Sequence, residues 1–183
     1  RTNSSTLYIT VDLTNPTSTI NTPSNNSATN DNTPDINFTL TDNIGNPINY
    51  TFFLNGSTNK TGNVANNTAT NVTMNALSNG LWLIIVQATD NASNKANSST
   101  LYLTIDTLNP TSTINAPSNN TNTTDSTPDI NITMTDNLDS NITYNIYLNG
   151  SINKTGFVSN NTATNVTLSD ALANGLWLII AEA

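Results

Sequence analysis

The stretch DINFTLTD, residues 35–42, decides the fold class of this chain. Its apolar residues, Ile36, Phe38 and Leu40, are separated by single Asn or Thr residues. Successive side chains of a β-strand point to opposite faces, so this alternation predicts a strand with one buried face and one solvated face. The stretch DINITMTD, residues 129–136, repeats the pattern 94 residues later.

The whole chain repeats itself at about that distance. Residues 3–74 and 97–168 share 49 identities in 72 aligned positions, which indicates a tandem duplication. The spacing then grows to 95, because NALSNGLW at residues 75–82 returns as SDALANGLW at residues 169–177. A unit of this length, with turn signals roughly every 8 to 12 residues, is typical of a β-sandwich. We therefore expect an all-β chain made of tandem seven-stranded sandwiches.

The strands of one unit can be assigned from the same alternation and from the turn signals. In the first unit they cover residues 17–23, 35–42, 50–54, 57–64, 69–74, 81–89 and 99–106. The fourth segment is expected as a polar hairpin that follows the Asn55-Gly56 turn. No segment has the period of a helix.

The composition excludes several classes of function. The chain has no His and no Cys, which excludes His-based acid-base chemistry, Cys nucleophiles, disulfides and Cys/His zinc sites. A net charge of -8 with only 4 Lys and Arg residues cannot form a basic track for nucleic acid or for an anionic membrane. The longest apolar run, Leu81 to Val86, is too short to span a bilayer. Since no nucleophile elbow or phosphate loop is present either, we expect no enzymatic activity.

The run NGLWLIIVQATDNASNKANSSTLYLTID, residues 79–106, followed by NPTSTI at residues 109–114, resembles the bacterial and archaeal Ig-like repeat family. That family has a Gly-x-aromatic strand, then Ala-x-Asp-x-Ala-Gly-Asn, then a strand ending in Val-Asp-x-x-x-Pro. Here the aromatic residue is Trp82, Ser93 stands where the family has Gly, and the closing strand ends at Asp106. The resemblance implies extracellular Ig-like sandwiches, which serve in adhesins, surface layers and filaments of archaea and bacteria.

The register of the repeat divides the chain into three parts. Residues 1–12 match the closing strand of a repeat, residues 13–106 match a complete repeat, and residues 107–183 match a repeat without its closing strand. In one interpretation the chain is part of a long tandem array, and the next covalent repeat supplies that strand. Truncation of a longer protein at a domain edge would produce the same division into three parts.

In the other interpretation the chain is a discrete subunit that polymerises with copies of itself. Asn3 to Asp12 of one copy would insert into the next copy through Leu7, Ile9 and Val11, as in strand addition. Both interpretations predict end-to-end assembly into a filament, sheath or surface layer. An adhesin repeat that binds carbohydrate or another cell surface is the alternative function.

Ig-like topology places the third, sixth and seventh strands in one sheet. We expect an apolar stripe on the outward face of this sheet, formed by Phe53, Leu83, Ile85 and Tyr102 and copied as Tyr147, Leu178 and Ile180. Such a stripe suits a contact between protomers or an aromatic platform for sugar, although strand propensity alone also favours these residues. The opposite sheet presents a polar face, with Asn37, Thr39, Asn71 and Thr73 outward.

The chain carries 18 N-x-S/T triplets, and its composition gives about ten by chance. We predict partial N-glycosylation of an exported chain, at triplets that recur in both units. These are Asn3, Asn25, Asn37, Asn55, Asn59, Asn66 and Asn71 with their copies Asn97, Asn119, Asn131, Asn149, Asn153, Asn160 and Asn165.

The joint between repeats is the expected metal site. Asp12 enters the end of the sandwich where the loops that carry Asp42 and Asp90 are also expected. Carboxylates are hard oxygen ligands suited to Ca²⁺, and the family resemblance implies that calcium can stiffen such joints. The equivalent residues at the second joint are Asp106, Asp136 and Asp139. Turn and cap chemistry is the alternative role for these Asp residues.

Overall fold

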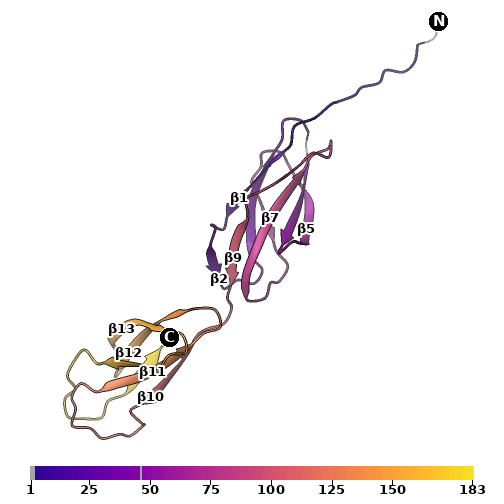
Figure 1. Cartoon of the computed structure of the whole chain (residues 1–183). Helices are drawn as coiled ribbons and strands as arrows, with labels where there is room; N and C mark the ends of the chain where they lie inside the picture. The colour runs from indigo at the N-terminus through magenta and orange to yellow at the C-terminus, as the bar shows by residue number, and fades with distance from the viewer. Residues whose placement is uncertain (1–2, 46) are drawn as a thin grey trace. The chain divides into compact units, whose positions relative to one another are not determined.

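The computed structural model describes residues 3–45 and 47–183, and within them the chain is all β (Figure 1). It divides into two compact units, unit 1 (Arg1–Thr107) and unit 2 (Leu108–Ala183). The division lies one residue from the boundary expected from the repeat. The prediction of an all-β sandwich fold is confirmed.

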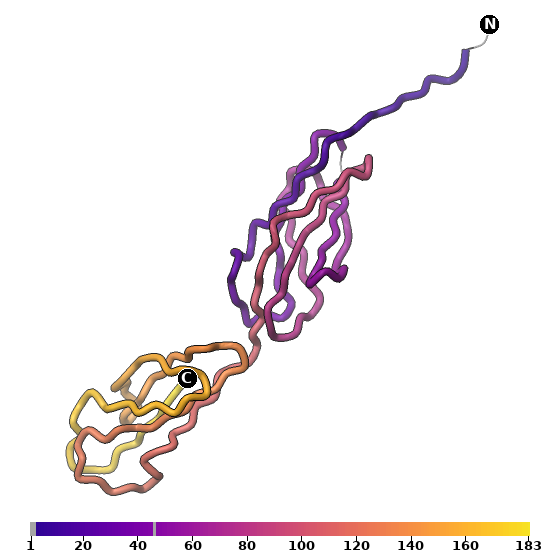
Figure 2. The backbone as a smooth tube through the Cα atoms, viewed as in Figure 1, coloured from indigo at the N-terminus to yellow at the C-terminus, as the bar shows by residue number. Residues whose placement is uncertain are grey.

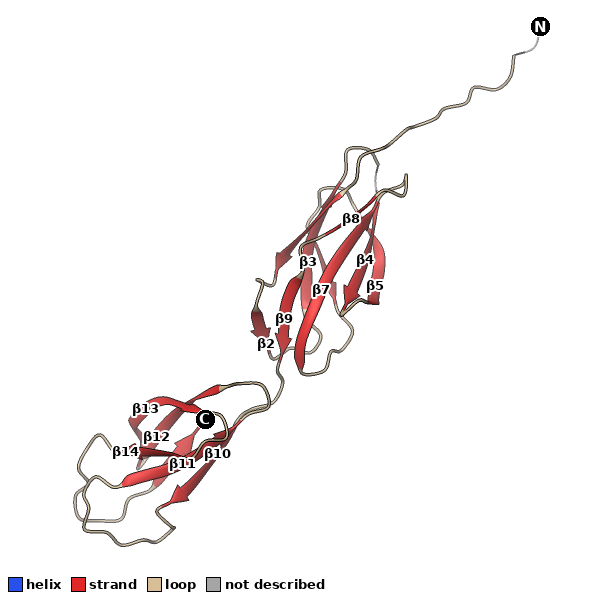
Figure 3. Ribbon diagram, viewed as in Figure 1, coloured by secondary structure: helices blue, strands red, loops and turns tan. Residues whose placement is uncertain are grey.

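Unit 1 is a sandwich of two sheets (Figure 3). Its strands are β1 (Thr17–Thr22), β2 (Ser27–Thr29), β3 (Asp35–Thr41), β4 (Ile48–Leu54), β5 (Ser57–Val64), β6 (Thr70–Thr73), β7 (Gly80–Thr89), β8 (Lys95–Asn97) and β9 (Leu101–Ile105). One sheet has the order β1-β3-β6 and the other β2-β9-β7-β4-β5, with β8 paired to β7. All seven expected segments contain strands, and the short strands β2 and β8 are additional.

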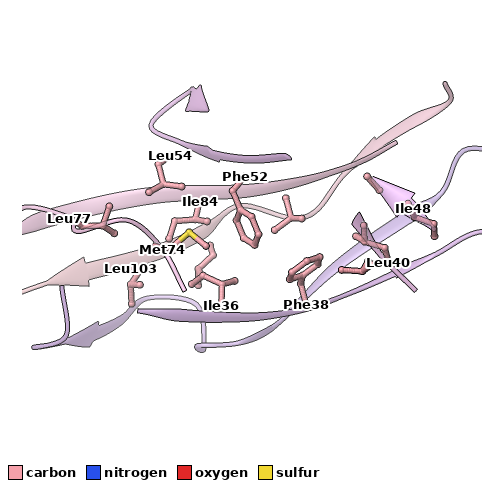
Figure 4. Packing of buried hydrophobic residues seen from close by; sticks show 14 of the residues in the cluster. Ile36, Phe38, Leu40, Ile48, Phe52, Leu54, Met74, Leu77, Ile84 and Leu103 are labelled. Carbon is pink, nitrogen blue, oxygen red and sulfur yellow. The ribbon is translucent and has the colours of Figure 1, made fainter. Parts of the chain in front are cut away.

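The core of unit 1 forms between the two sheets because each strand places alternate side chains inward (Figure 4). Ile36, Phe38 and Leu40 on β3 are buried, as their alternation predicts. The ring of Phe38 packs edge-on against Phe52, with the centroids 5.2 Å apart, and makes a similar contact with Tyr50. Aromatic pairs in this geometry contribute roughly 0.5 to 1.5 kcal/mol beyond the area they bury.

The expected polar hairpin at residues 57–64 is instead one continuous strand, β5. It pairs antiparallel with β4 along its length, and the turn between them is Asn55-Gly56, in which both residues have positive φ. Gly62 lies opposite Tyr50, and a Cβ built on Gly62 would come within 2.5 Å of the Tyr50 hydroxyl oxygen. The sequence is too polar here to indicate a strand by alternation, so the pairing with β4 decides its conformation.

Unit 2 repeats this arrangement in part. Its strands are β10 (Thr111–Ala116), β11 (Asp129–Thr135), β12 (Asn141–Leu148), β13 (Ser151–Ser159), β14 (Thr164–Thr167) and β15 (Ile179–Glu182). They form the sheets β10-β11-β14 and β13-β12-β15. The core is again built from alternating residues, among them the fully buried Ile130, Ile132 and Met134 of β11.

We predict that Gly62→Ala destabilises the chain by about 1 to 3 kcal/mol, because the new methyl group must displace the Tyr50 ring. Urea unfolding monitored by circular dichroism measures the change. Thr61→Ala is the matched control, since Thr61 is the exposed neighbour on the same strand. Equal stability of the Gly62 variant and the control would show that the Tyr50 ring has room to move.

Candidate functional site

The outer edge of β15 is the first candidate site. β15 pairs with β12 on one side, from Leu148 opposite Ile179 to Asn145 opposite Glu182. In unit 1 the equivalent strand β7 pairs with β4 on one side and with β9 on the other. Within residues 108–183 no strand takes the place of β9, so β15 is an edge strand where β7 is a central one.

The missing neighbour changes the conformation of the chain next to β15. In unit 1 the first residues of β7, Gly80–Leu83, pair only with β9, because β4 contacts β7 from Ile84 onward. The same Gly-Leu-Trp-Leu sequence in unit 2, residues 175–178, is not a strand. Leu81 is 55% exposed in unit 1, whereas its counterpart Leu176 is 93% exposed. This sequence therefore becomes a strand only where its partner strand is present.

The segment that matches β9 lies at the other end of the chain. Residues 3–12 and 97–106 are identical at eight of ten positions. Residues 3–15 form no strand, and Figure 2 shows the indigo N-terminal part of the chain as one extended trace. Leu7, Ile9 and Val11 are 78%, 76% and 71% exposed. Their counterparts Leu101, Leu103 and Ile105 are 3%, 0% and 0% exposed. The N-terminal segment thus has the alternation of an inward-facing strand, and its apolar residues are exposed.

The second candidate site is a cluster of carboxylates in unit 1. Asp12, Asp42 and Asp90 each offer a carboxylate oxygen, and the three atoms lie within 4.8 Å of one another. The convergence expected from the sequence is therefore present in the structure. Asp90 is buried and accepts two hydrogen bonds from Asn94, at its backbone N and at Nδ2, each 2.8 Å long. The Asn94 Nδ2 also donates to the carbonyl oxygen of Asp12, at 3.1 Å.

One oxygen atom of this cluster is suited to act as a metal ligand. Asp42 Oδ2 accepts from the backbone N of Ile44, but Asp42 Oδ1 is buried and has no hydrogen-bond partner among the described residues. A buried carboxylate oxygen without a partner is costly, and a hard cation satisfies it. Ser93, in the same loop as Asp90, adopts a φ of 72°, so it takes the left-handed conformation for which glycine is favoured.

The equivalent carboxylates are divided between the units. Asp106 belongs to unit 1, whereas Asp136 and Asp139 belong to unit 2. Asp136 Oδ1 accepts hydrogen bonds from the backbone N of Asp139 and of Leu138, which hold the pKa of this carboxyl below its usual value. Asp136 thus also has the turn-stabilising role that was the alternative.

The predicted apolar stripe lies on the outward face of its sheet. Leu83 and Tyr102 are 39% and 38% exposed, and Phe53 and Ile85 are half-buried beside them. In unit 2 the exposed members are Leu178 and Ile180. The Tyr147 hydroxyl donates to the Glu182 carboxylate, and this hydrogen bond raises the pKa of Tyr147.

The opposite sheet carries a ladder of asparagines that the sequence analysis missed. Asn21 Nδ2 donates to Asn37 Oδ1 at 2.7 Å, and Asn37 Nδ2 donates to Asn71 Oδ1 at 2.5 Å. Asn115, Asn131 and Asn165 repeat the ladder in unit 2. Alignment of these residues depends on strand pairing and on a bulge near Asn21, so no pattern along one strand could reveal it.

A glycan is attached to the Nδ2 atom of Asn. The predicted glycosylation sites differ in whether this atom already donates a hydrogen bond within the protein. Asn66 Nδ2 donates to the carbonyl oxygens of Asp42 and Gly45, and Asn160 makes the equivalent pair of bonds. These hydrogen bonds hold the loop that follows β3 in unit 1 and the loop that follows β11 in unit 2. By contrast, Asn55 and Asn149 lie exposed on hairpin turns, where their Oδ1 atoms accept from backbone N atoms.

A family model described as bacterial Ig-like domain matches residues 3–107. The chain belongs to the bacterial Ig-like domain family. The match begins at the N-terminal segment and ends after β9, so it includes two copies of the closing-strand sequence. The Ig-like resemblance read from Trp82, Ser93 and Asp106 is thereby confirmed.

Solved structures similar to this Ig-like chain include the fibronectin(III)-like modules of Clostridium thermocellum CbhA, at 14% identity and a TM-score of 0.42. That alignment covers 90% of this chain and 92% of the other. Dimeric latent PorU from Porphyromonas gingivalis is similar at 12% identity and a TM-score of 0.37, over 92% of this chain and 18% of PorU. No curated protein matched the sequence. Among the described residues no helix is long and apolar enough to cross a membrane.

Proposed function

We propose that this chain is a structural repeat of an extracellular filament, sheath or surface layer, in which sandwiches follow one another end to end. The observation that carries the proposal is the tandem repeat: residues 3–74 and 97–168 share 49 identities in 72 positions, and each unit builds a core of its own. The role is mechanical and involves no catalysis.

Two further features support this role. The surface is rich in Asn, Ser and Thr, which keep a long assembly hydrated without charge repulsion. The strand needed at β15 can come in line from a longer array or from another copy, and either source gives a linear assembly. Membership in the bacterial Ig-like family supports an extracellular or cell-surface location.

The exposed stripe around Leu83 and Tyr102 favours a second candidate, an adhesin repeat that contacts carbohydrate or another cell. The two candidates differ in the state of this face. A lateral contact inside an assembly buries the stripe, whereas an adhesin leaves it exposed at the surface.

We also propose that Ca²⁺ binds Asp12, Asp42 and Asp90. The ion would neutralise three carboxylates whose oxygens lie within 4.8 Å of one another, in a chain with a net charge of -8. Because Asp12 precedes β1 and Asp90 follows β7, bound calcium would fix the segment before β1 to the end of the sandwich.

A third proposal concerns glycans. Asn55 and Asn149 are good acceptors, because they are exposed, lie on turns and do not use Nδ2 in the hydrogen bonds described above. Asn66 and Asn160 are poor acceptors, because a glycan would remove donors that hold the Asp42 and Asp136 loops.

The function is tested by labelling. Gold-conjugated antibody raised against the chain should decorate surface filaments, a sheath or a surface layer of intact source cells continuously. Electron microscopy measures the distribution, and cells treated with pre-immune serum are the control. Label confined to isolated patches that bind carbohydrate would favour the adhesin, and label inside the cells alone would contradict both.

For the metal site, we expect Ca²⁺ to raise the free energy of unfolding of the chain by about 2.7 kcal/mol when its concentration is 100 times its Kd. Scanning calorimetry with and without chelator, together with isothermal titration, measures this effect. Asp42→Asn should abolish it, because a neutral amide is a poor calcium ligand. Asp31→Asn, at an exposed position outside the cluster, should leave it intact. Absence of binding heat would remove the proposal.

For the glycans, peptide mass spectrometry of the native protein should find Asn55 and Asn149 occupied and Asn66 and Asn160 bare. Ser57→Ala and Ser151→Ala, which remove the acceptor triplets at the two turns, should each lower the intact mass by one glycan. An occupied Asn66 would contradict the geometric argument, and an intact mass equal to that of the bare polypeptide would contradict glycosylation altogether.

A further inference from the structure

We infer that Asn25 carries an N-linked glycan whose first sugar ring lies in a surface pocket of unit 1, between β1 and the start of β9. The inference rests on the proposed glycosylation of this chain and deepens it, because it names a further acceptor and the place that the attached sugar occupies. Three observations support it: the amide nitrogen of Asn25, the pocket beside this residue, and the hydroxyl group of Ser27.

Asn25 is bound through its side-chain oxygen. It lies exposed in the loop between β1 and β2, where Asn25 Oδ1 accepts from Tyr102 N at 2.9 Å. The next residue adds a second bond to the same strand, because Asn26 N donates to the Tyr102 carbonyl oxygen at 2.9 Å. Asn25 Nδ2 has no hydrogen-bond partner among the described residues. The side chain is therefore fixed, and the atom that accepts a glycan is available.

A pocket with a volume of about 180 Å³ lies next to Asn25. It is lined by residues of β1, of the loop that holds Asn25, and of the chain just before and at the start of β9. Every residue that lines it is uncharged. The apolar members are Ile20, Pro23 and Leu101, and the others, apart from Asn25, are Ser and Thr residues. This mixed lining suits a sugar ring, which has apolar C–H faces and a rim of hydroxyl groups.

The volume of the pocket limits the kind of occupant. Pockets that bind free drug-sized ligands measure roughly 300 to 1,000 Å³, so this pocket is too small to bind such a ligand tightly. A cavity of roughly 150 Å³ is enough for a benzene ring, so a single six-membered ring fits. A ring attached to Asn25 needs little affinity of its own, because the covalent bond gives it a high local concentration beside the pocket. The pocket therefore suits the first sugar of a glycan.

Hydroxyl groups of the lining can bind the hydroxyl groups of the sugar. Ser18 Oγ donates to the Val86 carbonyl oxygen at 2.8 Å, which fixes its position and leaves its lone pairs to accept. The hydroxyl groups of Thr19 and Thr100 have no hydrogen-bond partner among the described residues, so each can donate and accept. A sugar that packs on Ile20 would thus displace water from these groups without leaving them unpaired.

Ser27 completes the acceptor triplet Asn25-Asn26-Ser27. Its Oγ atom is buried and has no hydrogen-bond partner among the described residues. A buried hydroxyl group without a partner lowers the stability of the folded chain, and alanine would avoid that cost. Packing therefore gives no reason for a hydroxyl group at residue 27, whereas glycan transfer to Asn25 requires one.

The second unit keeps the triplet although it changes the residue. Residues 119–121 are Asn-Asn-Thr, so Thr121 stands in place of Ser27. Ser and Thr are the two residues that complete an acceptor triplet, and the exchange is between them. Thr121 Oγ1 also donates to the Ser118 carbonyl oxygen at 2.6 Å, a bond without a described counterpart at Ser27. The triplet is the property that the two positions share.

The modification is a glycosyl transfer from a lipid-linked sugar phosphate, which the source cell supplies together with its transferase. A bond forms between Asn25 Nδ2 and C1 of the sugar, the bond from C1 to the donor phosphate breaks, and one amide proton passes to a base of the transferase. Asn25 keeps one N–H and its Oδ1 atom, so the hydrogen bond from Tyr102 N survives. Because Ser27 Oγ is buried in the folded chain, transfer precedes folding.

Mass spectrometry and NMR of the native glycoprotein test the attachment and the position of the ring. Peptide mass spectrometry should find a glycan on Asn25. Protons of its first sugar should show nuclear Overhauser effects to the methyl groups of Ile20 and Leu101. The sugar on Asn55, which does not line this pocket, is the matched control and should show none to these methyl groups. A bare Asn25, or an occupied Asn25 without these effects, would overturn the inference.

Thermal unfolding separates the effect of the glycan from that of the hydroxyl group. In the native glycoprotein Ser27→Ala should lower the Tm by about 2 to 4 °C, because the ring is lost from the pocket. In the full chain produced without glycosylation the same substitution should leave the Tm unchanged or raise it, because Ser27 Oγ has no partner to lose. Ser57→Ala, which removes the triplet at Asn55, should keep the Tm within about 1 °C in both forms. An unchanged Tm of the Ser27 variant in the glycoprotein would contradict the contact.

These outcomes are separable from those of the proposed function. A glycan on Asn55 with a bare Asn25 would reject the inference and keep the proposed glycosylation. An intact mass equal to that of the bare polypeptide would reject both. Continuous labelling of surface filaments, a sheath or a surface layer does not depend on either result.

Discussion

The two sandwiches depend on the pairing of one central strand, β7 in unit 1 and β15 in unit 2, with a neighbouring strand on each side. In unit 1 the backbone of β7 is satisfied by β4 and β9, and its side chains complete one wall of the core. In unit 2 the same sequence has a partner on one side, and part of it loses strand structure. An open strand edge next to an apolar core can pair with a further strand.

The fold explains why the chain contains so many Asn and Thr residues. Asn and Thr alternate with core residues along each strand, and in the sheet they form ladders such as Asn21, Asn37 and Asn71. Uncharged polar residues give a strand a solvated face whose side chains can hydrogen-bond to those of the adjacent strand. Charged residues of one sign would repel each other there. Asn also stabilises the turns and loops, where it adopts positive φ and its side chain accepts hydrogen bonds from backbone N atoms. A chain with few charges and many Asn residues is therefore ordered.

The two candidate sites use the same part of the repeat. The closing-strand segment ends in an Asp, and in unit 1 that residue, Asp12, lies with Asp42 and Asp90 where Asn94 holds its carbonyl oxygen. Residues 3–11 of this segment provide the apolar alternation of a strand.

The sequence by itself determined the all-β class, the inward residues of each long strand, the repeat boundary and the residues of the first carboxylate cluster. It could do so because these follow from local alternation and from internal identity, both of which are written along the chain. Tertiary structure alone decided that residues 57–64 form one strand, that the asparagines align across the sheet, and that residues 175–178 are not a strand. These features depend on a neighbour distant in sequence: β5 needs β4, the ladder needs a bulge near Asn21, and the Gly-Leu-Trp-Leu sequence needs a closing strand. An isolated β-strand does not satisfy its own backbone groups, so its conformation is decided by what lies beside it.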